Sequence, residues 1–155
     1  MRTLLASAAV FMGLAAAAAA CPTYSMQGAT FAVTGQDLYS PNSYSVTAGG
    51  NNNLRNCGFN HPGYVISAPD FTFYTQGMAP YNRLEIEVTS QACDTVLLVN
   101  SANGSWFYDD DSNGNLRPAI NLYGQSNISG RVDVWVGTYG TSLCPATLEM
   151  ETWYN

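Results

Sequence analysis

Short runs of alternating polar and apolar residues constrain the fold of this chain more than any other feature. After residue 20, no segment shows the 3.6-residue apolar repeat of an amphipathic helix. Instead, Val, Ile, Thr, Tyr and Phe recur in short runs that Gly, Asn, Pro and Ser separate. Residues 83–89 and 131–138 place apolar side chains at every second position. This pattern predicts strands with one buried face and one face that meets solvent or a ligand.

The number of such runs predicts an all-β domain. We expect a jelly-roll-like antiparallel β-sandwich of about 8–10 strands. The candidate strands are residues 29–34, 44–47, 64–67, 70–75, 83–89, 95–100, 105–108, 119–122, 131–138 and 146–152. Residues 95–99 are apolar on both sides, which predicts a central strand that is covered on both faces. The Asn- and Gly-rich residues 48–58 carry no strand signal and are expected to form a polar loop.

The first twenty residues predict a secretory signal peptide. Arg2 precedes an unbroken run of small and apolar residues whose last three, Ala18-Ala19-Ala20, form an A-x-A cleavage site directly before Cys21. A membrane anchor is the alternative, but the apolar run is barely long enough and lacks a positively charged flank. Acylation of Cys21 would need a larger aliphatic residue in place of Ala18. We therefore expect residues 1–20 to be cleaved and residues 21–155 to form a single exported domain.

The charge of the chain excludes strongly anionic partners. Beyond residue 20 the chain has four Arg, no Lys and eleven Asp or Glu, which gives a formal net charge of −7. Nucleic acids and anionic lipids bind clusters of Lys and Arg. We therefore expect no nucleic-acid partner and no membrane insertion.

Four cysteines predict two disulfides. Their even number and the absence of a C-x-x-C spacing favour disulfides over a zinc or redox site. Three pairings are possible. We prefer Cys21 with Cys57 and Cys93 with Cys144, because each half of the chain then has its own link and the N-terminus is fixed.

Three consecutive aspartates at residues 109–111 predict a metal site. Asp109, Asp111 and Asn113 precede a glycine in the D-x-D-x-N-G pattern that opens a calcium-binding loop. The loop is not an EF-hand, because Ile120 stands where an EF-hand requires a bidentate Glu. Oxygen ligands without His or Cys favour calcium over a transition metal, and Asp110 is a further candidate ligand. A solvated acidic turn is the alternative.

Four motifs follow one another in the C-terminal half of the chain. They are Asp94-Thr95-Val96-Leu97, Ala102-Asn103-Gly104, Asp109-Asp110 with Gly114, and the strand from Gly130 to Val136. In this order they resemble the bacterial pre-peptidase C-terminal domain family. The resemblance implies a sandwich found on secreted proteins, in the periplasm or outside the cell, with calcium and substrate binding in some members and no peptidase activity of its own. By family position, Asp94 and Asp133 would join the calcium ligands.

Aromatic side chains near the acidic turn predict a ligand-binding surface. Trp106 and Tyr108 share one face of their strand, Trp135 lies on the outer face of another strand, and Tyr139 follows the end of that strand. Exposed Trp and Tyr rings are suited to stacking on sugars or peptides. Packing in the core is the alternative for each ring.

Together these features predict a secreted, non-enzymatic, calcium-stabilised β-sandwich that binds an extracellular polysaccharide or protein. A self-assembling structural or envelope protein is the alternative. A secreted hydrolase ranks third, because His61 is expected to be a turn residue and no G-x-S-x-G motif supplies a nucleophile. The alternating glutamates at 85 and 87 and at 149 and 151 have the pattern of solvated strands.

Overall fold

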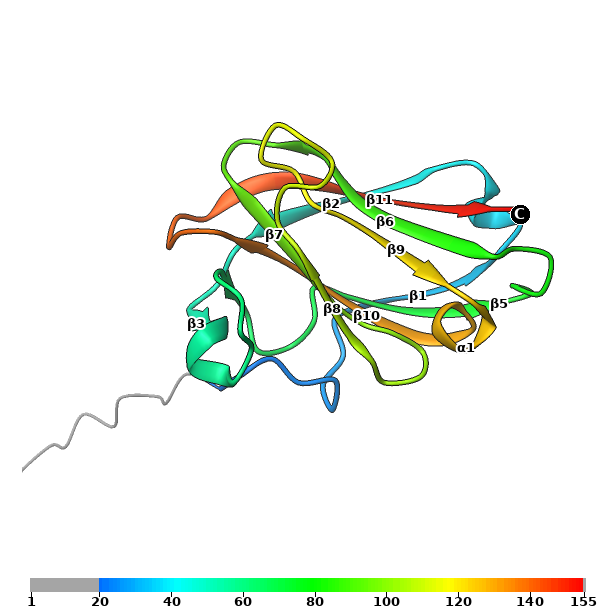
Figure 1. The fold of residues 1–155 in the computed structure, drawn as a ribbon, viewed down its shortest axis with the longest axis horizontal. Helices are drawn as coiled ribbons and strands as arrows, with labels where there is room; N and C mark the ends of the chain where they lie inside the picture. Colours follow the sequence, from blue (N-terminus) through cyan, green and yellow to red (C-terminus); the bar gives the residue numbers. More distant parts are fainter. Residues whose placement is uncertain (1–19, 155) are drawn as a thin grey trace, which may run out of the picture.

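The structure is a computed structural model that describes residues 20–154, and the predicted signal peptide, except for Ala20, lies outside the described residues. Within residues 20–154 the chain forms eleven strands in two sheets that pack face to face (Figure 1). A four-residue helix, α1 (Gln125–Ile128), and two 3-10 helices, η1 (Asp37–Tyr39) and η2 (Leu54–Cys57), lie in the connections. The predicted all-β sandwich is confirmed.

The larger sheet has seven strands. Its main strands are ordered β1 (Ala29–Thr34), β5 (Phe71–Gln76), β10 (Gly130–Thr138), β7 (Thr95–Asn100) and β8 (Trp106–Asp109). Two short strands, β4 (Tyr64–Val65) and β3 (Asn52–Asn53), extend the sheet beside the end of β10. The pairing of β1 with β5 is parallel, so the sandwich departs from the fully antiparallel arrangement that was predicted.

The smaller sheet has four antiparallel strands. Their order is β2 (Asn42–Ala48), β11 (Cys144–Trp153), β6 (Arg83–Gln91) and β9 (Ala119–Tyr123). An irregularity between Thr147 and Leu148 shifts the register of β11 against β6.

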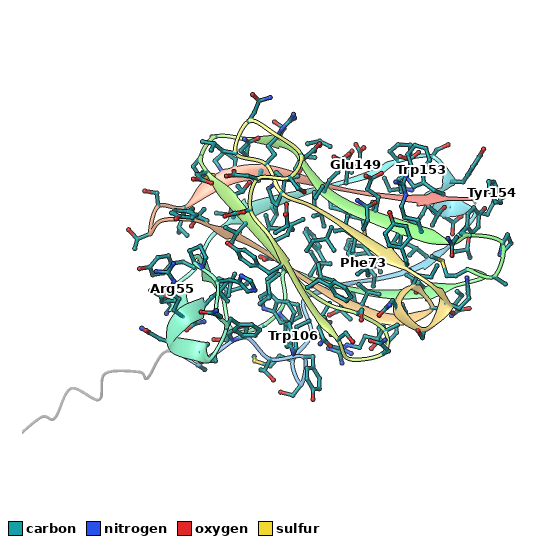
Figure 2. All side chains as sticks on the ribbon, viewed as in Figure 1. Arg55, Phe73, Trp106, Glu149, Trp153 and Tyr154 are labelled. Atoms are coloured by element: carbon teal, nitrogen blue, oxygen red, sulfur yellow. A yellow bond between two sulfur atoms is a disulfide. The ribbon has the colours of Figure 1, made fainter. Side chains whose placement is uncertain are left out.

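The core lies between the sheets and follows the predicted alternation. Leu84, Ile86 and Val88 of β6 are fully buried, and Phe73 of β5 projects from the larger sheet into the same space (Figure 2). Each such side chain contributes about 1.5–3 kcal/mol relative to exposure. All six residues of β7 are buried, which confirms the central strand covered on both faces.

A second apolar cluster lies on the outer face of the larger sheet. It consists of Leu54, Val65, Leu98 and Trp135, all fully buried. Leu54 belongs to η2, so residues 48–58 are not the simple polar loop that was predicted. They include β3 and η2, and they cover part of the sheet because Leu54 packs against it.

Two disulfides, Cys21–Cys57 and Cys93–Cys144, confirm the preferred pairing. The first ties the N-terminal segment to the last residue of η2. The second joins Cys93, in the connection from β6 to β7, to the first residue of β11. In the chain-entropy model, loops of this size stabilise the fold by about 4 kcal/mol each. Among residues 20–154, no helix is long and apolar enough to span a membrane.

Candidate functional site

Asp109 is the last residue of β8 and closes the loop that follows it. Its Oδ2 accepts hydrogen bonds from the Ser112 backbone N (3.1 Å), the Ser112 hydroxyl (2.8 Å) and the Ala119 backbone N (2.9 Å). One carboxylate oxygen thus holds both ends of the acidic turn together. Asp109 therefore has a structural role whether or not a cation binds nearby.

Asn113 forms its hydrogen bonds with residues outside the three aspartates. Its side-chain amide donates to the Glu87 carboxylate on the smaller sheet, and its backbone N donates to the Arg117 carbonyl at 3.0 Å. The Asn113 amide of the predicted calcium pattern is thus hydrogen-bonded to a carboxylate of the other sheet.

Asp94 shares its surroundings with Asp110 and Asp111. Burial raises the pKa of Asp94, and the negative charges of Asp111 and Asp110 raise it further. Its buried Oδ1 has no hydrogen-bond partner among residues 20–154. Nevertheless, the part of the chain that the structure describes contains no group of three or more His, Cys, Asp or Glu side chains arranged to hold a metal ion. Calcium binding therefore stays a prediction.

Asp133 lies far from the acidic turn, although the family resemblance implied that it would join it. The backbone of Asp94 accepts a hydrogen bond from Tyr139, which is six positions beyond Asp133 and hence about 20 Å along the strand. The Asp133 side chain is buried in an ion pair with Arg131 (Nε–Oδ2 2.9 Å), and it accepts a 2.6 Å hydrogen bond from the Thr72 hydroxyl. It therefore cannot act with the aspartates of the turn.

The predicted aromatic residues of β8 do form a site. A pocket of about 190 Å³, which we call the aromatic pocket, opens on the outer face of the larger sheet. Its lining includes Phe59, Asn60, His61, Leu98, Trp106 and Tyr108. Trp106 and Tyr108 point to the same side of β8, as predicted, and both are only partly buried. Figure 2 places Trp106 on the side of β8 that faces away from Phe73 and the core.

The opposite side of the aromatic pocket comes from the segment after η2. Gly58 adopts a φ of 84°, which ends η2 and redirects the chain toward β8. The Phe59 ring then meets Trp106 edge-on, with ring centroids 5.1 Å apart. The His61 ring stacks on Tyr108 at 4.2 Å, with 9° between the ring planes. Aromatic contacts of this kind each contribute about 0.5–1.5 kcal/mol beyond area burial, so they hold the pocket in shape.

The Tyr108 hydroxyl is a buried polar group of the aromatic pocket that lacks a protein partner within residues 20–154. It is buried, and it forms no hydrogen bond within residues 20–154. Burial raises the pKa of Tyr108, and the charge of Asp110 adds to the effect, so the hydroxyl stays protonated at neutral pH. It can therefore donate a hydrogen bond to a bound molecule.

The other two aromatic residues predicted to bind ligand lie elsewhere. Trp135 is on the outer face, as predicted, but it is fully buried beneath the η2 segment and packs against Trp106 with ring centroids 5.2 Å apart. It supports the aromatic pocket from behind and cannot touch a ligand directly. Tyr139 is 47% exposed beyond the end of β10, and it does not line the aromatic pocket.

The glutamates of the smaller sheet form a square on its outer face. Glu87 lies opposite Glu149, and Glu85 lies opposite Glu151. Burial raises the pKa values of Glu87 and Glu151, and the charges of Glu85 and Glu149 add to the effect. Like charges directly opposite each other on adjacent strands destabilise the fold, so these four glutamates lower its stability.

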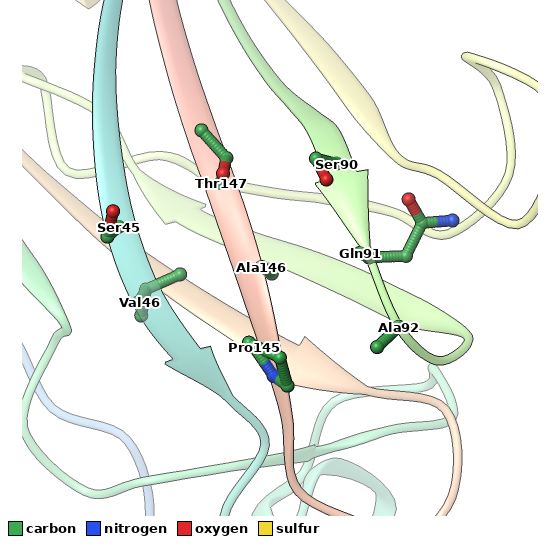
Figure 3. Close-up of a pocket in the computed structure, with 8 residues that line it drawn as sticks. All are labelled: Ser45, Val46, Ser90, Gln91, Ala92, Pro145, Ala146 and Thr147. Carbon is green, nitrogen blue, oxygen red and sulfur yellow. The ribbon is translucent and has the colours of Figure 1, made fainter.

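A pocket of about 290 Å³ on the same sheet does not include these glutamates. Figure 3 shows its lining across β2, β11 and β6, which includes Ser45, Ser90, Gln91, Pro145, Ala146 and Thr147. The carboxylates and this pocket are therefore separate features of the sheet.

Sequence reasoning missed Phe59 as a site residue and assigned His61 to a turn without a ligand. Both follow Cys57 closely, and the Cys21–Cys57 disulfide is the one sequence signal that this segment is held in place. Nothing in the residues themselves indicated that the segment lies over β8.

The resemblance to the pre-peptidase C-terminal domain family stays a prediction. Comparisons of the chain with protein-family models, with curated proteins and with solved structures find no match.

Proposed function

We propose that the chain is an exported β-sandwich that binds an extracellular polysaccharide in the aromatic pocket. The observation that carries the proposal is the combination of partly exposed aromatic rings with the Tyr108 hydroxyl, which lacks a partner within the described chain. Sugar rings present C–H faces that pack on aromatic rings, and hydroxyls that require hydrogen bonds. The aromatic pocket offers both kinds of contact.

The rigidity of the pocket also supports binding. Trp106 packs on Trp135, and His61 packs on Tyr108, so the rings are ordered before a ligand arrives. A binding site that is formed in advance loses less conformational entropy on association. Asn60 supplies a further amide at the rim of the pocket.

Binding without hydrolysis is the function we propose. His61 lies face to face with Tyr108 and forms no hydrogen bond to a hydroxyl or carboxylate within residues 20–154, so it lacks the partners of a general base. The glutamate square lies on the other sheet, away from the aromatic pocket. Binding of a protein and self-assembly are the competing functions, and the experiment below separates them.

Tyr108→Phe gives the sharpest test of the proposal. The purified protein is run in native gels that contain cellulose derivatives, xylan, mannan, starch or alginate, and retardation is measured. We expect at least one polysaccharide to retard the wild type, and Tyr108→Phe to weaken that binding about tenfold, because the variant loses only one hydrogen-bond donor. Its melting temperature should not fall, since that hydroxyl has no partner in the folded protein.

Tyr123→Phe is the matched control, because Tyr123 is 56% exposed on the smaller sheet. It should bind like the wild type. Retardation by none of the polysaccharides contradicts the proposal. Retention on a peptide array in that case favours a protein partner, and concentration-dependent sedimentation favours self-assembly.

A further inference from the structure

A second pocket lies beside the aromatic pocket on the same face of the larger sheet. Its volume is about 250 Å³, and its lining includes Tyr24, Asn100, Ser101, Arg131 and Asp133. We call it the polar pocket. We propose that the aromatic and polar pockets are two subsites for one extended neutral oligosaccharide that crosses Trp106. This inference rests on the proposed function and adds the length and charge of the ligand.

The strand register places the two pockets next to each other. Asp133 of β10 lies opposite Asn100 of β7, and Asn100 lies opposite Trp106 of β8. Side chains that are directly opposite across a sheet point to the same face. Asp133, Asn100 and Trp106 therefore form one row of side chains across the sheet. This row leads from the polar pocket to the Trp106 ring, which lines the aromatic pocket.

Trp106 stands between the two pockets. Its ring centroid is 5.1 Å from that of Phe59, which lines the aromatic pocket, and 6.3 Å from that of Tyr24, which lines the polar pocket. Tyr24 is 55% exposed. A ligand that passes from one pocket to the other would meet Trp106 first and Tyr24 next.

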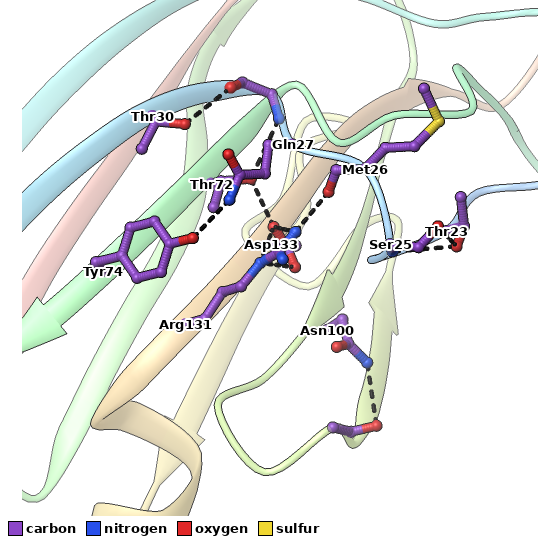
Figure 4. A network of polar contacts seen from close by, with 12 residues as sticks. Thr23, Ser25, Met26, Gln27, Thr30, Thr72, Tyr74, Asn100, Arg131 and Asp133 are labelled. Atoms are coloured by element: carbon purple, nitrogen blue, oxygen red, sulfur yellow. Dashed lines mark hydrogen bonds and ion pairs between the residues drawn. The ribbon is translucent and has the colours of Figure 1, made fainter.

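The polar pocket is built around a fixed ion pair. Asp133 is 1% exposed, and its carboxylate holds the Arg131 guanidinium and the Thr72 hydroxyl (Figure 4). Arg131 also donates to the Met26 carbonyl, so the N-terminal segment braces it. The side chain of Arg131 is still 30% exposed. A braced but accessible guanidinium can donate to sugar hydroxyls in a defined direction.

The volumes favour one ligand across both pockets. Sites for small molecules usually measure about 300–1,000 Å³. Each pocket alone is smaller than this range, and the two together fall within it. A ligand of at least two sugar rings would fill them.

The charges favour a neutral polymer. The negative charges of Asp110, Asp109 and Asp94 act on Tyr108 in the aromatic pocket, so they would repel a uronate or sulfate group there. Arg131 cannot offset this repulsion, because Asp133 already neutralises it. Neutral hexose or pentose polymers meet no such penalty.

Calorimetric titration with oligosaccharides of one to six units tests the inference. The oligosaccharides come from the neutral polysaccharide that retards the protein most strongly, and alginate oligomers serve as the anionic probe. We expect affinity to rise at least tenfold from one unit to two or three units, and then to level off. Alginate oligomers should not bind.

Tyr24→Ala tests the polar pocket without disturbing the core. The variant should lose about tenfold in affinity for the longer oligosaccharides and nothing for the single sugar. Phe59→Ala should weaken binding at every length. Tyr123→Ala, on the other sheet, should change neither.

The outcomes separate this inference from the proposed function. Affinity that is independent of ligand length, or an unchanged affinity in Tyr24→Ala, overturns the two-subsite inference and leaves polysaccharide binding intact. Tighter binding of alginate than of the neutral oligomers overturns the predicted charge. Failure of every polysaccharide to bind the wild type overturns the proposed function and this inference together.

Discussion

Replacing Asp70 with asparagine is expected to stabilise the protein at neutral pH. Asp70 directly precedes β5, and its Oδ2 accepts a 2.8 Å hydrogen bond from the backbone N of Val136 in β10. Burial raises the pKa of Asp70 from 3.8 to about 7, although the Val136 hydrogen bond partly opposes this effect. The asparagine side chain keeps an oxygen for the Val136 N–H and never carries a charge.

The sign and size of the effect follow from proton linkage. Because the pKa is higher in the folded state, the folded protein binds the proton more tightly than the unfolded chain. The stabilisation from this proton is complete below about pH 4, and it is lost as the pH rises through about 7. The pKa of Asp70 in the folded protein exceeds its value in the unfolded chain by about three pH units. Each unit corresponds to about 1.4 kcal/mol, so the stabilisation that is lost at high pH is at most about 4 kcal/mol.

Urea unfolding of both proteins at several pH values from 4 to 8 provides the assay. The two proteins should have similar free energies of unfolding near pH 4, and Asp70→Asn should become progressively more stable toward pH 8. Glu87 and Glu151 also have raised pKa values, but they titrate in both proteins and cancel in the difference. A difference that stays constant from pH 4 to pH 8 would refute the reasoning.

Asp37→Asn provides a control of opposite sign. Hydrogen bonds from the Thr34 side chain and backbone lower the pKa of Asp37, despite a small opposing effect of burial. Its stabilisation is therefore present at neutral pH and is lost as the pH falls below about 4. The variant should have a lower free energy of unfolding than the wild type at pH 7. The two free energies should become similar at low pH.

Three further predictions concern the four glutamates of the smaller sheet, the Cys93–Cys144 disulfide and calcium. Glu151→Gln should raise the free energy of unfolding by about 0.2–1 kcal/mol, and by less in 1 M salt, because it removes like charges from adjacent strands; an unchanged urea midpoint in low salt would count against it. Replacing Cys93 and Cys144 together by serine should lower stability by about 4 kcal/mol, measured by urea unfolding; a loss below 1 kcal/mol would contradict this expectation. If calcium binds, a tenfold excess over its dissociation constant should add about 1.4 kcal/mol, and a melting temperature insensitive to both calcium and chelator would remove the prediction.

Much of the fold could be predicted because each strand carries its own local signal. Residues 95–100 and 29–34 were placed without error, since turn residues on both sides limit each run. The pairing of the cysteines was also accessible, although it depended on a preference for separate links and not on geometry. Both kinds of prediction need information only about neighbours in sequence or about chain connectivity.

The candidate site was only partly accessible because it depends on which segments meet in space. Strand alternation correctly put Trp135 on the outer face, but it could not reveal that Leu54 and η2 cover that face. The spacing of Asn113 suggested a calcium ligand, yet its side-chain amide donates a hydrogen bond to Glu87 of the other sheet. In both cases a contact between distant parts of the chain decides the outcome, and no local pattern encodes it.

The position of β11 in the smaller sheet has a consequence for how the chain is made. This strand, Cys144–Trp153, lies between β2 and β6 in the sheet. Strands β2 and β6 are therefore joined only after the ribosome has synthesised β11, near the end of the chain. Pairings such as Asn42 with Met150 close very long loops, which makes folding slow. The smaller sheet would therefore stay incomplete until the end of synthesis, and an incompletely folded polypeptide can be threaded through a translocation channel.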